Sequence, residues 1–122
     1  MSAATLPGLR VLIVEDEYLL ADDLARGLRQ AGAVVIGPVA SVEAALALIA
    51  SEPVLHTAIL DVNLGGESVY SVADALSAHG VPYIFATGYD AADLLPGYQH
   101  VPRCAKPVSI KALIPVLART AN

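Results

Sequence analysis

Apolar residues along the chain form short continuous runs that alternate with stretches of helical spacing. A continuous apolar run is typical of a strand buried on both faces of a parallel sheet. Such runs predict strands over residues 9–14, 33–40, 57–61 and 81–88, and a weaker strand within 100–106. Between the strands, apolar residues recur three or four positions apart. This spacing predicts helices over residues 18–31, 41–52, 69–79 and from 109 onward, with at most a short helix at 91–95.

Strand and helix alternate five times, which predicts an α/β fold with helices on both faces of a parallel sheet. The simplest arrangement is a doubly wound, flavodoxin-like three-layer sandwich with five strands in the order 2-1-3-4-5. Pro102 restricts the fifth strand to an edge position, and Pro115 is expected to kink the last helix. We expect one domain over residues 9–120, preceded by a flexible tail at residues 1–8.

The composition and charge of the chain indicate whether to expect nucleic acid or a membrane as a partner. The chain has 122 residues, 56% of them hydrophobic and only 16% charged, and its formal net charge is −5. With 7 Lys and Arg against 12 Asp and Glu, we expect no nucleic-acid surface. No apolar run approaches the roughly 20 residues that span a bilayer, and the first ten residues do not resemble a signal peptide. We therefore expect a cytoplasmic protein that does not enter a membrane.

Charged and hydroxyl residues stand where the predicted strands end. Glu15 and Asp16 follow the first strand, Asp61 ends the third before a Gly-rich loop, Thr87 ends the fourth, and Lys106 follows the fifth. Functional sites of doubly wound sheets lie beyond the carboxyl ends of the strands. Because the first and third strands are predicted neighbours, their ends should bring three carboxylates together.

These residue types together suit phosphoryl transfer. Clustered carboxylates repel one another, and a divalent cation among them reduces that cost. Oxygen ligands at this density favour Mg²⁺. An Asp carboxylate can act as a nucleophile and form an acyl phosphate. Lys106 and Thr87 would supply a positive charge and a hydrogen-bond donor to the transferred group.

At this point the sequence resembles the receiver domain of bacterial two-component response regulators. The resemblance covers residues 9–120 and rests on four motifs in order: Glu15-Asp16, Leu60-Asp61, Thr87 and Lys106-Pro107. Each motif is weak alone, but all four stand at predicted strand ends. The sequence FATGY at residues 85–89 looks like a receiver subfamily that carries this motif.

The resemblance implies a phosphoacceptor and a metal site. Asp61 would accept a phosphoryl group from the phosphohistidine of a sensor histidine kinase or phosphotransfer protein. Asp16 would ligate Mg²⁺ directly, together with Asp61, and Glu15 would do so through water or at longer reach. The backbone carbonyl of Asn63 would be a further ligand. Many receivers carry Asp-Asp where this chain has Glu-Asp.

The resemblance also implies a switch. Thr87 would turn inward to bond a phosphate oxygen, and Lys106 would pair with the phosphorylated aspartate. Receivers usually carry an aromatic residue three positions before this lysine, but Arg103 stands there in this chain. Tyr89 could take the part of that aromatic residue or shield the phosphate from water.

The function implied is a phosphorylation-controlled signalling module that is not an enzyme, although it assists its own phosphorylation and dephosphorylation. Its downstream target would be another protein, and a homodimer stays open. One alternative is a Mg²⁺-dependent aspartyl phosphohydrolase of the haloacid dehalogenase kind. That family places its nucleophile after the first strand and a second Asp two residues later. In this chain the candidate nucleophile, Asp61, ends the third strand, and Asn63 stands in the second position. The other alternative is a receiver-like scaffold that works without phosphorylation.

Overall fold

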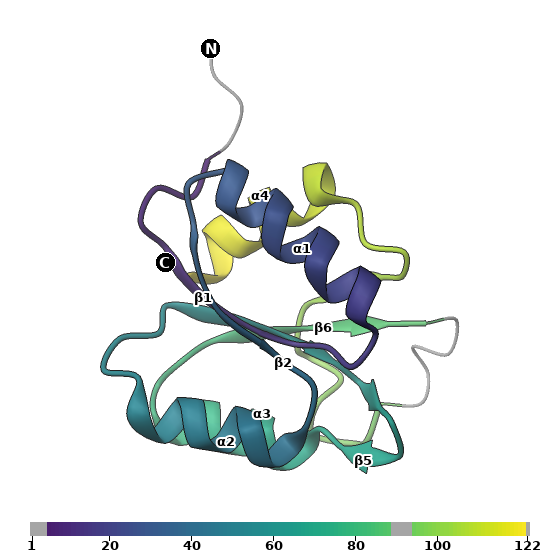
Figure 1. Cartoon of the computed structure of the whole chain (residues 1–122). Helices are drawn as coiled ribbons and strands as arrows, with labels where there is room; N and C mark the ends of the chain where they lie inside the picture. Colours follow the sequence, from purple (N-terminus) through teal and green to yellow (C-terminus); the bar gives the residue numbers. More distant parts are fainter. Residues whose placement is uncertain (1–4, 89–93, 122) are drawn as a thin grey trace.

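A five-stranded parallel sheet lies between two layers of helices in this computed structural model, which describes residues 5–88 and 94–121 (Figure 1). Its strands follow the order β2-β1-β3-β6-β7 and are all parallel. They comprise β1 (Arg10–Val14), β2 (Val34–Val39), β3 (Thr57–Asp61), β6 (Tyr83–Thr87) and β7 (Arg103–Ala105). This confirms the predicted order 2-1-3-4-5 and the flavodoxin-like fold.

Two helices cover each face of the sheet. α1 (Tyr18–Gln30) and α4 (Ile110–Ala121) lie on one face, whereas α2 (Val42–Ser51) and α3 (Tyr70–Ala78) lie on the other (Figure 1). α2 begins after Ser41, whose hydroxyl oxygen accepts a hydrogen bond from the backbone N–H of Ala44 at 3.1 Å. α4 continues through Pro115. The short helix predicted at 91–95 falls mainly outside the described residues. No helix in the described part of the chain is long and apolar enough to cross a membrane.

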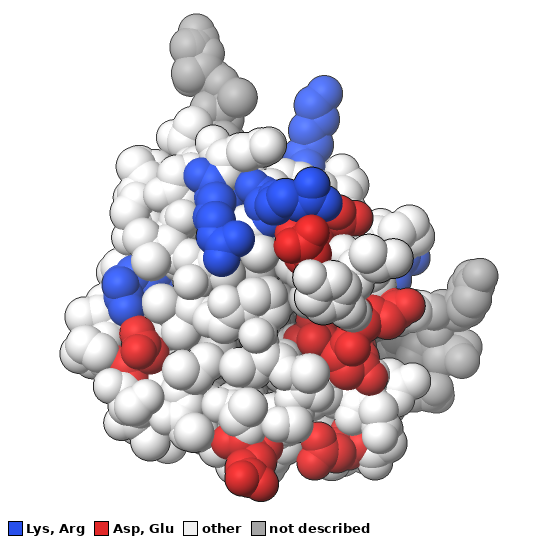
Figure 2. Space-filling view, in the orientation of Figure 1, with Lys and Arg blue, Asp and Glu red and all other residues white. Residues whose placement is uncertain are grey.

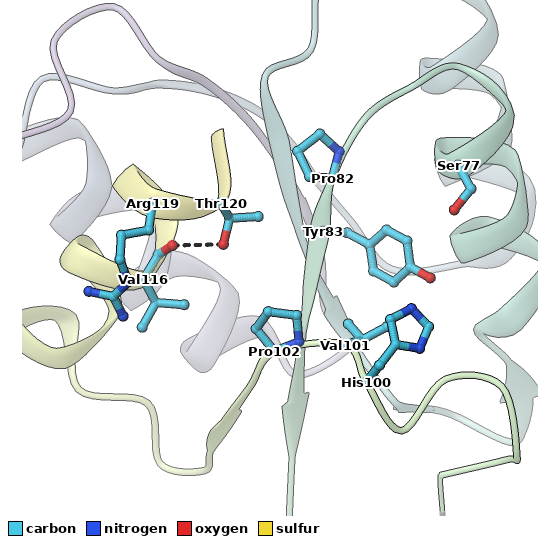
Figure 3. A pocket seen from close by; sticks show the side chains of 9 residues that line it. All are labelled: Ser77, Pro82, Tyr83, His100, Val101, Pro102, Val116, Arg119 and Thr120. Carbon is cyan, nitrogen blue, oxygen red and sulfur yellow. Dashed lines mark hydrogen bonds between the residues drawn. The ribbon is translucent and has the colours of Figure 1, made fainter. Parts of the chain in front are cut away.

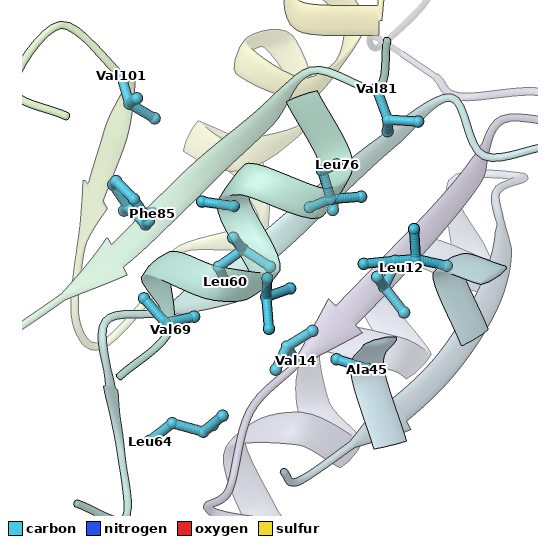
Figure 4. Packing of buried hydrophobic residues seen from close by; sticks show 14 of the residues in the cluster. Leu12, Val14, Ala45, Leu60, Leu64, Val69, Leu76, Val81, Phe85 and Val101 are labelled. Carbon is cyan, nitrogen blue, oxygen red and sulfur yellow. The ribbon is translucent and has the colours of Figure 1, made fainter. Parts of the chain in front are cut away.

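The core consists of two clusters, one on each face of the sheet. Alternate residues of the central strands enter opposite clusters, because successive side chains of a strand point to opposite faces. Leu12, Leu60 and Phe85 pack under α2 and α3 (Figure 4), whereas Ile13 and Ile59 pack under α1 and α4. Burial on both faces explains why these strands read as continuous apolar runs in the sequence.

The segment after Asp61 forms a hairpin that we did not predict. We expected a Gly-rich loop followed by a helix over residues 69–79. Instead, β4 (Asn63–Leu64) pairs antiparallel with β5 (Glu67–Ser68), and the helix begins at Tyr70. The two-residue turn consists of Gly65 and Gly66, whose φ angles are +57° and +88°. Positive φ at both central positions favours glycine and fits the twist of a hairpin.

The start of the chain packs against the domain from Leu6 onward. Residues 1–4 of the tail expected at 1–8 lie outside the described residues. Leu6 is 2% exposed, and its backbone N–H donates to the carbonyl of Ala31 at 2.8 Å. The N–H of Gly8 donates to the carbonyl of Gly32 at 2.9 Å. The described part of this segment is therefore anchored beside the end of α1.

Gly27 lets α1 approach α4 closely, and adding a methyl group there should destabilise the fold. Ala normally stabilises a helix by about 1 kcal/mol relative to Gly. At Gly27, however, a Cβ atom would lie 2.6 Å from Cγ1 and 2.7 Å from Cδ1 of Ile110. We expect Gly27→Ala to lower the free energy of unfolding by about 1–3 kcal/mol, measured by urea denaturation. In an Ile110→Ala background the same change should be neutral or stabilising. Equal stability of Gly27→Ala and the wild type would contradict this prediction.

Candidate phosphoacceptor and metal site

The carboxyl ends of β1 and β3 bring three carboxylates together. Glu15 and Asp16 follow β1, and Asp61 is the last residue of β3. One oxygen atom from each of the three carboxylates lies within 4.8 Å of the other two. β1 and β3 pair directly, so the sheet itself fixes this proximity. In the orientation of Figure 1, Figure 2 shows a group of acidic side chains at the end of the molecule where β6 terminates.

Asp61 is buried, and its two oxygen atoms have different surroundings. The side chain is 2% exposed. Oδ1 accepts a hydrogen bond from the backbone N–H of Asn63 at 3.0 Å and lies 3.0 Å from Nζ of Lys106. Oδ2 has no hydrogen-bond partner among the described residues. A buried acceptor without a partner is costly, so this oxygen is suited to bond an incoming group.

Lys106 joins the acidic cluster to the end of β6. Its Nζ lies 3.0 Å from Oδ1 of Asp61 and 3.3 Å from Oε1 of Glu15. Its backbone N–H donates to the carbonyl of Thr87 at 2.7 Å, and its peptide bond to Pro107 is cis. Burial alone would lower the pKa of Lys106, but the hydrogen bond and charge of Asp61, together with Glu15, raise it above its usual value. Lys106 therefore stays charged between the two acids.

Glu15 is held inside the cluster, where burial favours its protonated form. The residue is 4% exposed, and Oε2 accepts a hydrogen bond from the backbone N–H of Glu17 at 3.0 Å. The pKa of Glu15 is raised to about 7, mainly because the carboxyl group is buried and in addition because it lies beside Asp61. The Glu17 N–H and the charge of Lys106 act in the opposite direction. Without a cation, the cluster retains a proton more readily than separate carboxylates would.

The acidic cluster opens into a cavity of about 540 Å³ whose donor atoms fit a small divalent cation. Asp16 is exposed at its edge, and the lining also includes Asn63, Gly65 and Lys106. The free Oδ2 atom of Asp61 and the carboxylate of Asp16 are hard oxygen donors of the kind that Mg²⁺ binds. A cation would also offset the charge of Asp61, which adds to the effect of burial on the pKa of Glu15.

The structure describes only one of the two predicted switch residues. Thr87 is the last residue of β6 and is 6% exposed. The described lining of the cavity includes Gly88 but not Thr87. Among the described contacts, Thr87 reaches the site through its backbone carbonyl, which accepts a hydrogen bond from the backbone N–H of Lys106. Tyr89 lies outside the described residues.

A second pocket, of about 490 Å³, lies away from the carboxylates between the ends of α3 and α4 (Figure 3). Its polar side chains include those of Tyr83, His100 and Arg119. The hydroxyl of Thr120 donates to the carbonyl of Val116 at 2.7 Å. None of the predicted site residues lines this pocket, so the candidate chemistry belongs to the acidic cavity.

Sequence reasoning missed two features of the site. The Glu17 backbone N–H that fixes Glu15 carries no signal in the sequence, because any residue except proline supplies that donor. Gly65 also lines the cavity, since the hairpin turns back over Asp16. The adjacent Gly-Gly pair was a usable signal, because two glycines between short polar strands are typical of a two-residue hairpin.

Comparisons with known proteins identify the family through solved structures. No protein-family model matches the chain, and no curated protein matches it either. The solution structure of SdrG from Sphingomonas melonis Fr1 has 36% sequence identity and a TM-score of 0.81, and the match covers 100% of both chains. A response regulator receiver protein from Sinorhizobium medicae WSM419 has 21% identity and a TM-score of 0.79, covering 97% of this chain and 98% of that one. The chain belongs to the response regulator receiver domains.

A third structure bears on the metal site. The receiver domain of sensor histidine kinase PA1611 from Pseudomonas aeruginosa PAO1 was solved with a magnesium ion coordinated in its active-site cleft. It has 24% identity and a TM-score of 0.75, and the match covers 93% of this chain and 98% of that one. Receiver domains are phosphorylation-controlled signalling modules and in general not enzymes. The acidic cluster of this chain fits a divalent cation in the same fold.

The raised pKa of Glu15 predicts how the stability of the metal-free protein depends on pH. The pKa rises from 4.5, the ordinary value expected in the unfolded chain, to about 7 in the folded one. The folded state therefore binds more protons between these values, so the contribution of Glu15 to stability is present below pH 4.5 and is lost as the pH rises through 7.

Glu15→Gln removes this titration and serves as the comparison. We expect urea denaturation in the presence of EDTA to show that the wild type loses stability relative to Glu15→Gln as the pH rises through this range. A constant difference between the two proteins across the range would contradict the prediction.

Proposed function

We propose that this chain is a two-component signalling switch that accepts a phosphoryl group on Asp61. The donor would be the phosphohistidine of a sensor histidine kinase or of a phosphotransfer protein. The observation that carries the proposal is the asymmetry of Asp61. One carboxylate oxygen is held by Lys106 and the Asn63 N–H, while the other is buried and has no partner in the described structure.

In the proposed reaction, a carboxylate oxygen of Asp61 attacks the phosphorus atom of the phosphohistidine. The new O–P bond forms as the P–N bond breaks, and the electron pair of that bond returns to the imidazole of the donor. Lys106 holds the carboxylate in place beforehand and then stabilises the negative charge of the acyl phosphate. Hydrolysis would reverse the modification, and the same residues would assist both steps without making the chain an enzyme for external substrates.

The metal ligands in this proposal are Asp16, Asp61 and the backbone carbonyl of Asn63, with Glu15 acting through water or at longer reach. Bound Mg²⁺ would neutralise charge on the transferred phosphoryl group. Asp16 is the exposed carboxylate of the cluster, and Asn63 follows Asp61 by two residues with its N–H already on Oδ1. Oε1 of Glu15 lies 3.3 Å from Nζ of Lys106, and Oε2 accepts a hydrogen bond from the Glu17 N–H.

Phosphorylation would shift an equilibrium between two conformations of the region around β6 and β7. Moving such an equilibrium from 1:99 to 99:1 requires about 5.5 kcal/mol of preferential interaction. Two new charge-assisted bonds, from Thr87 and Lys106, would contribute about 1.5–3 kcal/mol each. Thr87 is buried beside the site and its carbonyl holds the Lys106 backbone, so the two would move together. Tyr89, in the FATGY motif of the proposed subfamily, would complete the switch.

Partners of this module are proposed from its surface. Among the large exposed hydrophobic residues described, Tyr18 and Leu19 are the most exposed, at 80% and 76%. They begin α1, directly after the acidic residues of the site. We assign this pair to docking of the phosphodonor protein.

The output would reach a downstream protein target in the cytoplasm, and a homodimer is compatible with this reading. The phosphohydrolase and the phosphorylation-independent scaffold are the alternatives.

The covalent step can be tested by intact mass. Incubation with a small phosphodonor and Mg²⁺ should add the mass of one phosphoryl group to the wild type and none to Asp61→Ala. Removal of Mg²⁺ with EDTA should slow the reaction strongly, because charge on the phosphoryl group is no longer neutralised. Asp22→Asn, which changes a carboxylate on α1 whose side chain is 45% exposed and pairs with Arg26, is the control and should react like the wild type. An adduct that persists in Asp61→Ala would contradict the assignment, and sustained turnover of an external phosphate ester would favour the phosphohydrolase.

Docking can be tested separately from chemistry. With a histidine kinase shown to phosphorylate the wild-type chain, Leu19→Ala should slow phosphotransfer about tenfold, the loss expected when about 1.4 kcal/mol of docking energy is removed. Its reaction with a small phosphodonor should be unchanged, because that donor needs no docking surface. Val34→Ala, 42% exposed at the start of β2, is the matched control and should behave like the wild type with both donors. Equal phosphotransfer to Leu19→Ala and the wild type would contradict the docking assignment.

A further inference from the structure

Asp16 differs from the other two carboxylates because no described residue holds it by a hydrogen bond or ion pair. Glu15 is held by Lys106 and the Glu17 N–H, and Asp61 by Lys106 and the Asn63 N–H. A metal ligand has to be placed within roughly 0.5 Å to bind well. Some other contact must therefore limit where the Asp16 carboxylate can lie.

Gly65 lines the same cavity as Asp16 and lies close to its carboxylate. A Cβ atom built on Gly65 would lie 3.1 Å from Oδ2 of Asp16, which is closer than ordinary van der Waals contact. The missing side chain therefore leaves the space that this carboxylate occupies. An added methyl group would force either the hairpin or the carboxylate to move by a few tenths of an ångström.

The hairpin is held more firmly than the carboxylate. Leu64 is 1% exposed in the core, and the carboxylate of Glu67 accepts a hydrogen bond from the N–H of Val42 at 3.2 Å. The N–H of Asn63 is bonded to Asp61 at 3.0 Å, which ties the first strand of the hairpin to the phosphoacceptor. A side chain at Gly65 would therefore displace Asp16 rather than the hairpin.

Gly66 offers an internal comparison. It is the next residue of the same turn and also has a positive φ, +88° against +57° for Gly65. A Cβ atom at Gly66 would meet nothing within 4 Å. Replacing either glycine by alanine strains the backbone, but only the change at Gly65 crowds the carboxylate.

We propose that Gly65 is a positioning residue for the metal site, because its missing side chain leaves the Asp16 carboxylate room to face Asp61. The inference rests on the proposed Mg²⁺ site and adds a residue that acts through one of its ligands. It assigns different purposes to the two glycines of the turn. Both glycines line the cavity, but only a side chain at Gly65 would meet the Asp16 carboxylate, so Gly65 serves the metal site as well as the hairpin.

The test measures Mg²⁺ affinity of the full chain by titration calorimetry, with thermal unfolding in EDTA as a separate readout of stability. Gly65→Ala should weaken Mg²⁺ binding about tenfold, the lower end of the loss seen when a group that orients a metal ligand is changed. Gly66→Ala should lower the unfolding temperature to a similar extent but keep Mg²⁺ affinity within about twofold of the wild type, since it leaves the ligands in place. Gly65→Asn carries the same Cβ on a residue that tolerates positive φ, so it should fold readily and still lose affinity.

The results distinguish a failure of the role of Gly65 from a failure of the proposed metal site. A loss of affinity confined to the two Gly65 variants supports the assignment. Equal affinity in Gly65→Ala and Gly66→Ala, with a wild type that binds Mg²⁺, overturns the role of Gly65 and leaves the proposed function intact. Wild-type affinity in Gly65→Asn overturns it as well. A wild type that binds no Mg²⁺ overturns the metal site itself and this inference with it.

Discussion

The ion pair between Lys106 and Asp61 is the interaction on which the site depends. It joins the end of β3 to the residue that follows β7, although these strands are not neighbours and β6 lies between them. A buried carboxylate without its cation would be left uncompensated, which is far more costly than the loss of an exposed pair. The lysine also approaches Glu15, so a single ammonium group offsets two of the three clustered acids. The lysine leaves part of the repulsion among the three carboxylates uncompensated, and a divalent cation would relieve it.

The fold brings these residues together because its parallel strands end side by side. Parallel strands all end at the same edge, so residues that follow β1, β3, β6 and β7 converge whatever their separation in sequence. Both faces of the sheet are covered by helices, and Asp61 at the end of β3 is only 2% exposed. The loops then contribute backbone donors, such as the N–H groups of Glu17 and Asn63, which cost no further side chain. The rigid sheet therefore sets the positions, and short turns refine them.

The sequence predicted the parts of the molecule that depend on repeated patterns. Continuous apolar runs located the strands, and the strand ends located Glu15, Asp16, Asp61 and Lys106, because one topological rule places all of them at one edge. The hairpin over residues 63–68 was missed, since each of its strands has only two residues and carries no periodicity. The anchoring of Leu6 was also missed, because a single apolar residue between small and polar ones gives no pattern.

The segment between β6 and β7 shows how the end of β6 is coupled to the rest of the fold. Described residues 94–101 pack on α3 through two tyrosines. Tyr98 donates a hydrogen bond to Asp74 at 2.6 Å, and its ring lies 4.5 Å from that of Tyr70. This hydrogen bond is the main cause that raises the pKa of Tyr98 to about 12, so the hydroxyl remains a donor at neutral pH. Tyr70 in turn contacts Phe85, with ring centroids 6.0 Å apart.

Phe85 stands two residues before Thr87 on the same strand, and both side chains therefore point to the same face of the sheet. A displacement of Thr87 toward a phosphoryl group on Asp61 would have to be accommodated by this aromatic packing. Close-packed rings resist gradual deformation and change between discrete arrangements. In this chain, where Arg103 occupies the place of the usual aromatic residue of β7, the rings that adjoin the site come from α3, β6 and the segment that follows it. A conformational signal that begins at Asp61 would therefore reach the surface by way of α3 as well as the edge of the sheet.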